Sequence, residues 1–327
     1  MTRWIKRQSA AATDFLMCAA MNASQWRLRR HICSREDFEA YLKEGETLTK
    51  EKFYPLVEME ELQEHADAIS WKSPRPSGFL ENDRAMALIF PCGKQEAPTV
   101  IILHVLMSAS DRGYRRWAKK FNDQGWNVAL LHLPFHYSRI PAHFFNGELA
   151  ITGNLIRFGE TVRQAVMEVR QLMAFFRARG CKEFGLWATS YGGWIGALTL
   201  SLEKDFCFAC LMQPIVNPEH TIWKSPASGM LRRLLSGPQI TAEDIARHSH
   251  LTSPIDSDPV CDPSRILIFG GTFDTLSPVS ELEKLHSRWR GSHLMIFPQG
   301  HFGYTIMNEA YRVCLPYLQD HNLPVAS

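Results

Sequence analysis

One serine stands at an abrupt junction between a predicted strand and a predicted helix. The apolar run 184–188 leads through Thr189 and Ser190 directly into a helix-like segment. A serine on so sharp a turn must adopt strained backbone angles, and only small residues on either side let the strand and the helix approach each other. Ala188 and Gly192 are small. The segment therefore predicts a serine hydroxyl that could act as a nucleophile, the alternative being an inert serine in a tight βα turn.

This segment resembles the nucleophile elbow of the α/β-hydrolase superfamily, whose pattern is small-x-Ser-x-Gly. Ala188 stands where a glycine is usual, and Gly192 and Gly193 follow the serine. The resemblance covers about residues 68–320. It implies a serine hydrolase in which the nucleophile, an acid and a histidine follow one another along the chain.

Two later loops resemble the acid and histidine loops of the same superfamily. Asp274 lies in 270–278, and His301 lies among small residues in 298–303. Asp274 could instead cap its own turn, but Ser277 before Pro278 is already a suitable helix cap. Each loop follows the carboxyl end of a predicted strand, where open α/β sheets place their sites.

Glu219 and Asp262 remain rival acids, because some members of the superfamily carry the acid after the preceding strand.

The chemistry expected of these residues follows from how weakly serine ionises. Ser190 needs a base, and His301 could accept its proton while Asp274 fixes the imidazole tautomer and stabilises the imidazolium. The resemblance also implies two oxyanion-binding backbone amides, those of Tyr191 and Leu106. Val105 stands where the superfamily often has glycine, so the backbone there is expected to turn its amide inward less freely.

The stretch 133–141, Leu-Pro-Phe-His-Tyr-Ser-Arg-Ile-Pro, is similar to a Pro-Phe-Tyr-Gly-x-Arg-x-Pro stretch. That stretch belongs to the subgroup of α/β-hydrolase domain-containing proteins classed as number eighteen.

Short apolar runs alternate with longer amphipathic ones from about residue 68, as expected for a mostly parallel sheet covered by helices. The predicted strands are 68–72, 84–90, 100–104, 127–132, 184–188, 206–212, 265–269 and 293–297. The predicted helices are 112–123, 160–179, 191–203, 279–289 and 304–318. The order predicts an eight-stranded, doubly wound α/β sheet with right-handed crossovers, which is the α/β-hydrolase fold.

Two segments lie outside this alternation. Residues 1–67 have helical spacing and are expected to form a helical extension, followed by a hydrolase domain at 68–327. Residues 214–264 are too long for an unstructured loop in a compact domain, so we expect an inserted cap with short helices near 230–235 and 242–248.

Composition excludes several classes of function. The chain has 36 Lys and Arg against 34 Asp and Glu, a balance too even to predict binding to nucleic acid. No apolar run approaches the 20 or so residues that a spanning helix needs. Eight cysteines without metal-type pairing predict reduced thiols in a cytoplasmic protein. His132, His136 and His143 lack further ligands nearby, so no metal is expected.

These observations predict a serine hydrolase that cleaves a small-molecule carboxylic ester or thioester through an acyl-enzyme and needs no cofactor. Short or medium acyl groups are expected, with the cap deciding specificity. The alternative is a catalytically inactive binding module with the same fold, which Ala188 and Val105 would favour. Oligomeric state is left open.

Overall fold

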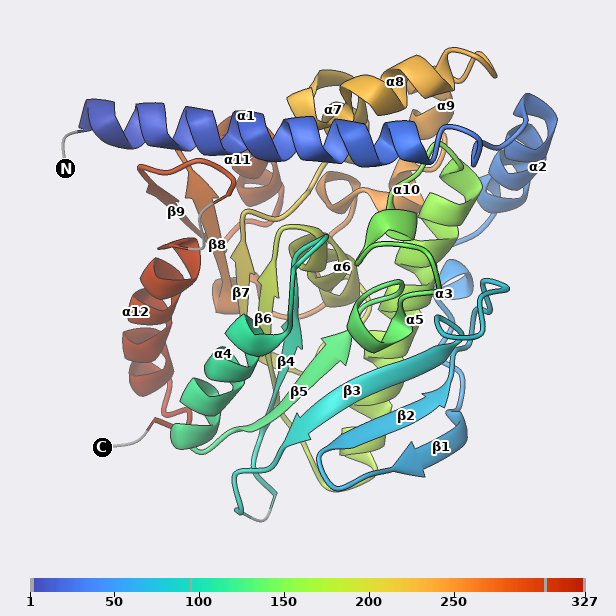
Figure 1. The fold of residues 1–327 in the computed structure, drawn as a ribbon. Helices are drawn as coiled ribbons and strands as arrows, with labels where there is room; N and C mark the ends of the chain where they lie inside the picture. The colour runs from blue at the N-terminus through green and yellow to red at the C-terminus, as the bar shows by residue number, and fades with distance from the viewer. Residues whose placement is uncertain (1–2, 95, 303–304, 326–327) are drawn as a thin grey trace.

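A computed structural model describes residues 3–94, 96–302 and 305–325. Its described part contains one nine-stranded sheet in the order β1-β2-β3-β5-β4-β6-β7-β8-β9 (Figure 1). The strands are β1 Glu60–Glu64, β2 Ala68–Lys72, β3 Arg84–Phe90, β4 Thr99–Leu103, β5 Asn127–His132, β6 Phe184–Thr189, β7 Phe206–Met212, β8 Ile266–Gly271 and β9 His293–Phe297. The strands from β5 to β9 in this order run parallel, whereas β1, β2 and β3 pair antiparallel.

The sheet has one strand more than the eight expected. The additional strand, β1, lies within 1–67, where only helices were predicted. All five of its residues, Glu-Glu-Leu-Gln-Glu, are exposed. An edge strand with both faces in solvent has no apolar alternation, so the sequence gives no period-two signal for it.

The described residues form twelve α-helices. They are α1 Arg3–Arg27, α2 Arg35–Glu46, α3 Lys50–Phe53, α4 Arg112–Asp123, α5 Leu155–Arg177, α6 Tyr191–Leu200, α7 Pro218–Lys224, α8 Gly229–Leu235, α9 Ala242–Ala246, α10 Ser249–Thr252, α11 Val279–Arg288 and α12 Thr305–Asp320. Of these, α4 and α12 cover one face of the sheet and α5 and α6 cover the other. Helix α5 begins five residues earlier than predicted, where Asn154 caps its first turn. Tyr304, the predicted start of the last helix, lies outside the described residues.

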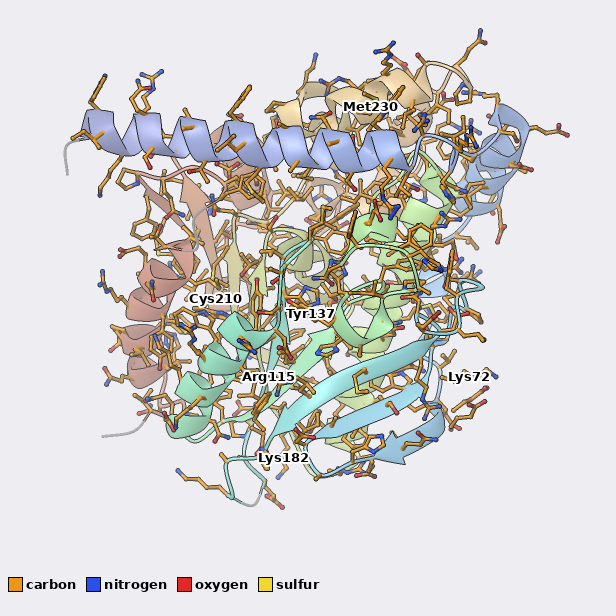
Figure 2. All side chains as sticks on the ribbon, in the orientation of Figure 1. Lys72, Arg115, Tyr137, Lys182, Cys210 and Met230 are labelled. Atoms are coloured by element: carbon orange, nitrogen blue, oxygen red, sulfur yellow. The ribbon has the colours of Figure 1, made fainter. Side chains whose placement is uncertain are left out.

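The two layers of core follow from alternation along the strands. On β4, Val100 and Ile102 pack with side chains of α4 and α12, whereas Ile101 and Leu103 pack with those of α5 and α6. Cys210 on β7 lies in the α4 and α12 layer (Figure 2). Both layers bury apolar side chains, so the sheet is rigid at the edge where the candidate residues lie.

Helix α1 lies across one end of the molecule, alongside residues 226–228 and α8 (Figure 1). Its buried residues include Ala10, Asp14 and Cys18, three positions on one face of the helix. Beside this face, the helix exposes Trp4 and Phe15, which are 69% and 73% exposed. In the described part of the chain, no helix combines the length and the apolar character that crossing a bilayer requires.

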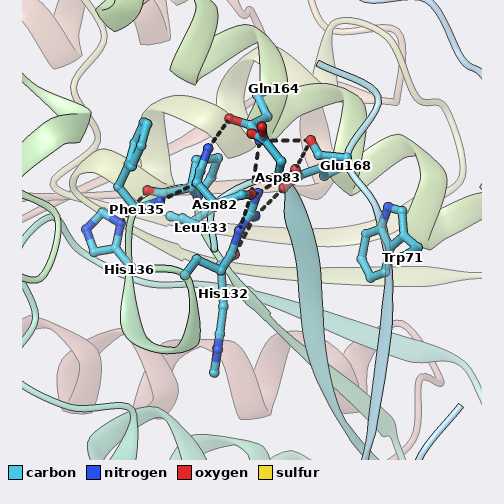
Figure 3. Close-up of polar contacts among 12 residues, drawn as sticks. Trp71, Asn82, Asp83, His132, Leu133, Phe135, His136, Gln164 and Glu168 are labelled. Atoms are coloured by element: carbon cyan, nitrogen blue, oxygen red, sulfur yellow. Dashed lines mark hydrogen bonds and ion pairs between the residues drawn. The ribbon is translucent and has the colours of Figure 1, made fainter. Parts of the chain in front are cut away.

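A buried polar network anchors the loop that follows β5. Arg139 and Glu168 form an ion pair of 2.6 Å, and both side chains are fully buried. Arg139 also donates to the backbone carbonyl of His132, and Ser73 donates to Glu168 at 2.6 Å. Asn82 accepts from the backbone N–H of Phe135 at 2.7 Å (Figure 3). A pair so fully hydrogen-bonded fixes the loop 133–139 against α5.

Removing one partner of this pair is expected to destabilise the protein strongly. Arg139→Ala should lower the free energy of unfolding by about 3–5 kcal/mol, because it leaves the Glu168 carboxylate buried without a counter-ion. Urea denaturation followed by tryptophan fluorescence measures this change. Lys119→Ala, which removes the exposed pair between Lys119 and Asp123, is the control and should have a far smaller effect. Equal effects of the two substitutions would refute the prediction.

Candidate active site

Ser190 occupies the single residue between β6 and α6, in a strained backbone conformation. Its φ is 53° and its ψ is −112°, values that non-glycine residues rarely adopt. The Ser190 N–H donates to the carbonyl of Met212 on the neighbouring strand at 2.8 Å, and its own carbonyl accepts from Trp194 at 2.9 Å. These bonds hold the turn in place and leave the side chain pointing away from the sheet.

The structure brings Ser190, His301 and Asp274 together in a continuous line of hydrogen bonds. Ser190 Oγ lies 2.8 Å from His301 Nε2, and His301 Nδ1 lies 2.8 Å from Asp274 Oδ2. Because a carboxylate only accepts, Nδ1 carries the donated proton and Nε2 is free to accept from the serine hydroxyl. The residues follow β6, β8 and β9, three of the last four strands in the sheet order, with β7 between β6 and β8.

Asp274 is held by donors on both oxygens. Oδ1 accepts from the backbone N–H groups of Leu276 and Ser277, each at 2.8 Å, and Oδ2 accepts from Gln213 Nε2 at 2.8 Å. The expectation that Ser277 would cap the next helix is wrong. Its hydroxyl donates to the Pro214 carbonyl, and Asp274 caps its own turn while it also binds His301.

The two rival acids lie elsewhere. Glu219 is exposed near the start of α7, and Asp262 accepts from the backbone N–H of Ser264 at 2.9 Å. The position after β7 is taken by Gln213, which bridges Asp274 and the carbonyl of Gly300. No motif in the sequence singled out this glutamine, because a lone amide after a strand has many roles.

Opposing effects act on the pKa of His301. Its burial disfavours the imidazolium and lowers the pKa, but the charge of Asp274 and the hydrogen bond to it raise the pKa, and Asp14 raises it further. The net result is a pKa above the ordinary value for histidine. The site therefore stabilises a proton on this imidazole once it has been accepted.

Two residues beside Ser190, Leu106 in the loop after β4 and Tyr191 at the start of α6, have backbone N–H groups without an acceptor in their own element. The N–H of Val105 donates to the Tyr114 hydroxyl at 3.0 Å, and the N–H of Met107 donates to His136 Nε2 at 3.2 Å. Between them, the Leu106 N–H makes no hydrogen bond to any described residue. Tyr191 is the first residue of α6, where backbone N–H groups have no intrahelical acceptor.

A cavity of about 440 Å³ opens onto Ser190 and His301. Its walls include parts of the loop after β4, of the 214–264 segment, of α1, and of α5, α6 and α12. Most of the lining is apolar: Met17, Met21, Leu106, Ile151, Phe158, Trp194, Ile215, Ile222, Leu231, Leu276, Ile306 and Met307. A concave, apolar cavity with a few convergent polar groups is the usual form of a small-molecule site.

No protein-family model matches the sequence, and no curated protein matches it significantly. Solved structures do match. An acetyl xylan esterase from Paenibacillus sp. R4 aligns with a TM-score of 0.60 at 13% identity, over 88% of this chain and 96% of the esterase. Acetyl xylan esterase 1 from Thermoanaerobacterium sp. JW/SL YS485 aligns with a TM-score of 0.53 at 16% identity, over 88% of this chain and 98% of that one. The chain has the α/β-hydrolase fold.

Two departures from the α/β-hydrolase pattern have simple structural explanations. The methyl group of Ala188 faces Gly196 on α6, and a Cβ added to Gly196 would lie 3.1 Å from that methyl group. The close approach of strand and helix is therefore made possible by a glycine on the helix, and not by a glycine at position 188. In the loop after β4, the residue with positive φ is Met107, at 53°, and Val105 needs no such conformation.

Two of the three histidines considered as metal ligands, His132 and His136, have other partners. His136 accepts from Met107 and contacts the Pro134 carbonyl at 2.8 Å, and His132 contacts Ser138 Oγ at 2.8 Å. His143 has a positive φ of 72° in a loop. Among residues 3–94, 96–302 and 305–325, no group of three potential ligands gathers around one point.

Gly192 is the position where the α/β-hydrolase turn tolerates least change. A Cβ there would lie 2.5 Å from the carbonyl oxygen of Leu103, so Gly192→Ala should lower the free energy of unfolding by at least about 1–3 kcal/mol. Gly113→Ala is a matched control, because Gly113 is also the second residue of its helix and meets open space. It should stabilise by about 0.4–1 kcal/mol. Thermal and urea unfolding distinguish the two, and a harmless Gly192→Ala would contradict the close packing of β4 on α6.

Proposed function

We propose that this protein is a serine hydrolase that cleaves a carboxylic ester or thioester through an acyl-enzyme intermediate. The observation that carries the proposal is the hydrogen-bonded line from Ser190 through His301 to Asp274 at the edge of an apolar cavity. The aligned structures named above are esterases, which supports ester chemistry for this site as well.

In the proposed reaction, Ser190 Oγ attacks the carbonyl carbon while His301 Nε2 takes the hydroxyl proton. Asp274 keeps the proton on Nδ1 and stabilises the imidazolium. The tetrahedral oxyanion accepts hydrogen bonds from the backbone amides of Tyr191 and Leu106. His301 then gives its proton to the leaving alcohol or thiol, and a water deprotonated by the same imidazole releases the acid. No cofactor takes part in these steps.

The lining of the cavity supports a substrate with an apolar acyl chain. Side chains such as Ile222 and Leu231 from the 214–264 segment, and Met21 from α1, surround the space next to Ser190. Burying each methylene of an acyl chain among them contributes about 0.8 kcal/mol. We therefore assign the cavity to the acyl group and the 214–264 segment to the role of a cap domain.

The competing proposal, an inactive binding module, was motivated by Ala188 and Val105. Because both residues fit the backbone without displacing the serine or the amides, they supply no reason for lost chemistry. This supports the hydrolase over the binding module.

Two finer assignments are also proposals. Arg139, which is fully buried and stands at the arginine of the subgroup's stretch, supports a relationship with the subgroup of α/β-hydrolase domain-containing proteins classed as number eighteen. The eight cysteines are all free thiols, and seven are buried, which supports a reducing compartment such as the cytoplasm.

Loss of the serine hydroxyl should abolish both chemistry and labelling. Ser190→Ala is expected to lower the turnover of nitrophenyl esters roughly 10⁴- to 10⁶-fold, because it removes the hydroxyl that lies within hydrogen-bond distance of His301. A fluorophosphonate probe should label the unmodified protein at Ser190 and fail to label the variant. Ser201→Ala, at the end of α6, is the control and should be labelled normally. Turnover that survives Ser190→Ala would refute the proposal.

Acyl-chain length offers a test of the cavity assignment. In a nitrophenyl ester series from acetyl to octanoyl, kcat/KM should rise by up to about fourfold per methylene until the cavity is full. Steady-state kinetics on each ester measures this slope. A maximum at acetyl followed by a steady fall would show that the cavity does not bind the acyl chain.

A further inference from the structure

Asp14 is the one acidic residue in the sequence of α1, and it faces the interior. Its side chain lies on the same face as Ala10 and Cys18, and the residue is only 5% exposed. Burial raises the pKa of this carboxyl group, which means that its position costs free energy. An apolar residue at that place would pack without such a cost, so the carboxylate calls for a specific explanation.

The contacts of Asp14 explain why a carboxylate is buried here, because its oxygens bind the loop that carries His301. Oδ2 accepts from the backbone N–H of His301 at 3.0 Å, and Oδ1 accepts from the backbone N–H of Phe302 at 3.1 Å. The carboxylate lies so close to this loop that a Cβ on Gly300 would be 2.8 Å from both oxygens. Glycine before the histidine is therefore what allows the helix to reach the loop.

Helix α1 is also fastened to the other side of the site. Asn22 accepts from the backbone N–H of Met230 at 2.5 Å and donates to the carbonyl of Pro226 at 2.9 Å. Between these anchors, Met17 and Met21 form part of the cavity wall. One helix thus contacts both the loop of the histidine and the wall of the proposed acyl site.

We propose that Asp14 is a positioning residue for His301, so that α1 is a working part of the active site. The carboxylate fixes the backbone of residues 301 and 302 and sets how far the imidazole reaches toward Ser190. Its negative charge also favours the imidazolium that forms when Ser190 attacks. This inference rests on the proposed function, since positioning matters only if His301 acts as the base.

The charged and titratable groups that face His301 define the expected pH effect. Asp274 lies on the loop after β8, and Asp14 and Cys18 lie on α1, where burial raises the pKa of the Cys18 thiol to about 11. Asp14 raises the pKa of His301, so neutralising Asp14 lowers it. The neutral, basic form of His301 then persists to lower pH. The acidic limb of the kcat/KM profile should shift to lower pH in Asp14→Asn.

The test compares Asp14→Asn with Asn22→Ala, which loosens the same helix without touching His301. In Asp14→Asn, kcat/KM at its optimum should fall roughly 10- to 100-fold, as expected for a displaced catalytic base. The acidic limb of its kcat/KM profile should move to lower pH. In Asn22→Ala, the acidic limb should lie at the same pH as in the unmodified protein. An unchanged limb and an unchanged kcat/KM in Asp14→Asn, or the same shift in both variants, would overturn the proposal.

A second measurement separates this proposal from the proposed function. NMR titration of the histidine side chains, with His301→Gln used to assign the signal, reports the pKa of His301 without any substrate. A lower pKa in Asp14→Asn than in Asn22→Ala supports the role of Asp14 even if no ester tested is hydrolysed. The inference is refuted if the pKa of His301 is identical in the two variants and the unmodified protein and Asp14→Asn hydrolyses esters at an unchanged, Ser190-dependent rate. That result would leave the proposed hydrolase function intact.

Discussion

The strained turn at Ser190 is the constraint on which the other features of the site depend. A positive φ on a residue with a Cβ is unfavourable, and it persists only where the surrounding contacts impose it. Gly192 lets α6 approach the backbone of β4, and the bond to Met212 fixes the end of β6. The packing of the sheet thus holds one hydroxyl in a fixed, partly buried position at the cavity.

The same edge of the sheet explains why residues far apart in sequence meet. Parallel strands present their carboxyl ends together, so the loops after β6, β8 and β9 carry Ser190, Asp274 and His301 to one place. The loop after β5 contributes indirectly. Arg139 fixes it through Glu168, and its His136 accepts from Met107, which orders the loop that bears Leu106. A fully buried ion pair therefore supports a backbone amide in the site rather than the charge of any reacting group.

Sequence patterns predicted the parts of the molecule that depend on residues close together in the chain. Apolar runs located eight strands, and small residues around Ser190 and His301 marked their turns. What the patterns missed depends on contacts between distant segments. Strand β1 has no apolar face, and Gln213 is an ordinary amide until folding places it between Asp274 and Gly300. Asp14 is the only carboxylate in the sequence of α1, and it lies 287 positions along the chain from the His301 amide whose N–H it accepts. Pairing over such a distance leaves no periodicity to detect.

The arrangement around His301 shows how burial and charge are balanced in this site. An imidazole surrounded by apolar walls is a weak base, because its charged form loses hydration. Asp274 on one side and Asp14 on the other compensate for that loss, and each of these carboxylates is stabilised by two backbone N–H groups. The donors that stabilise Asp14 belong to the loop that carries His301, so the same two bonds that offset the cost of burying Asp14 also fix the backbone at this imidazole. Geometry and basicity of His301 are therefore coupled through α1, and a change at this helix alters both together.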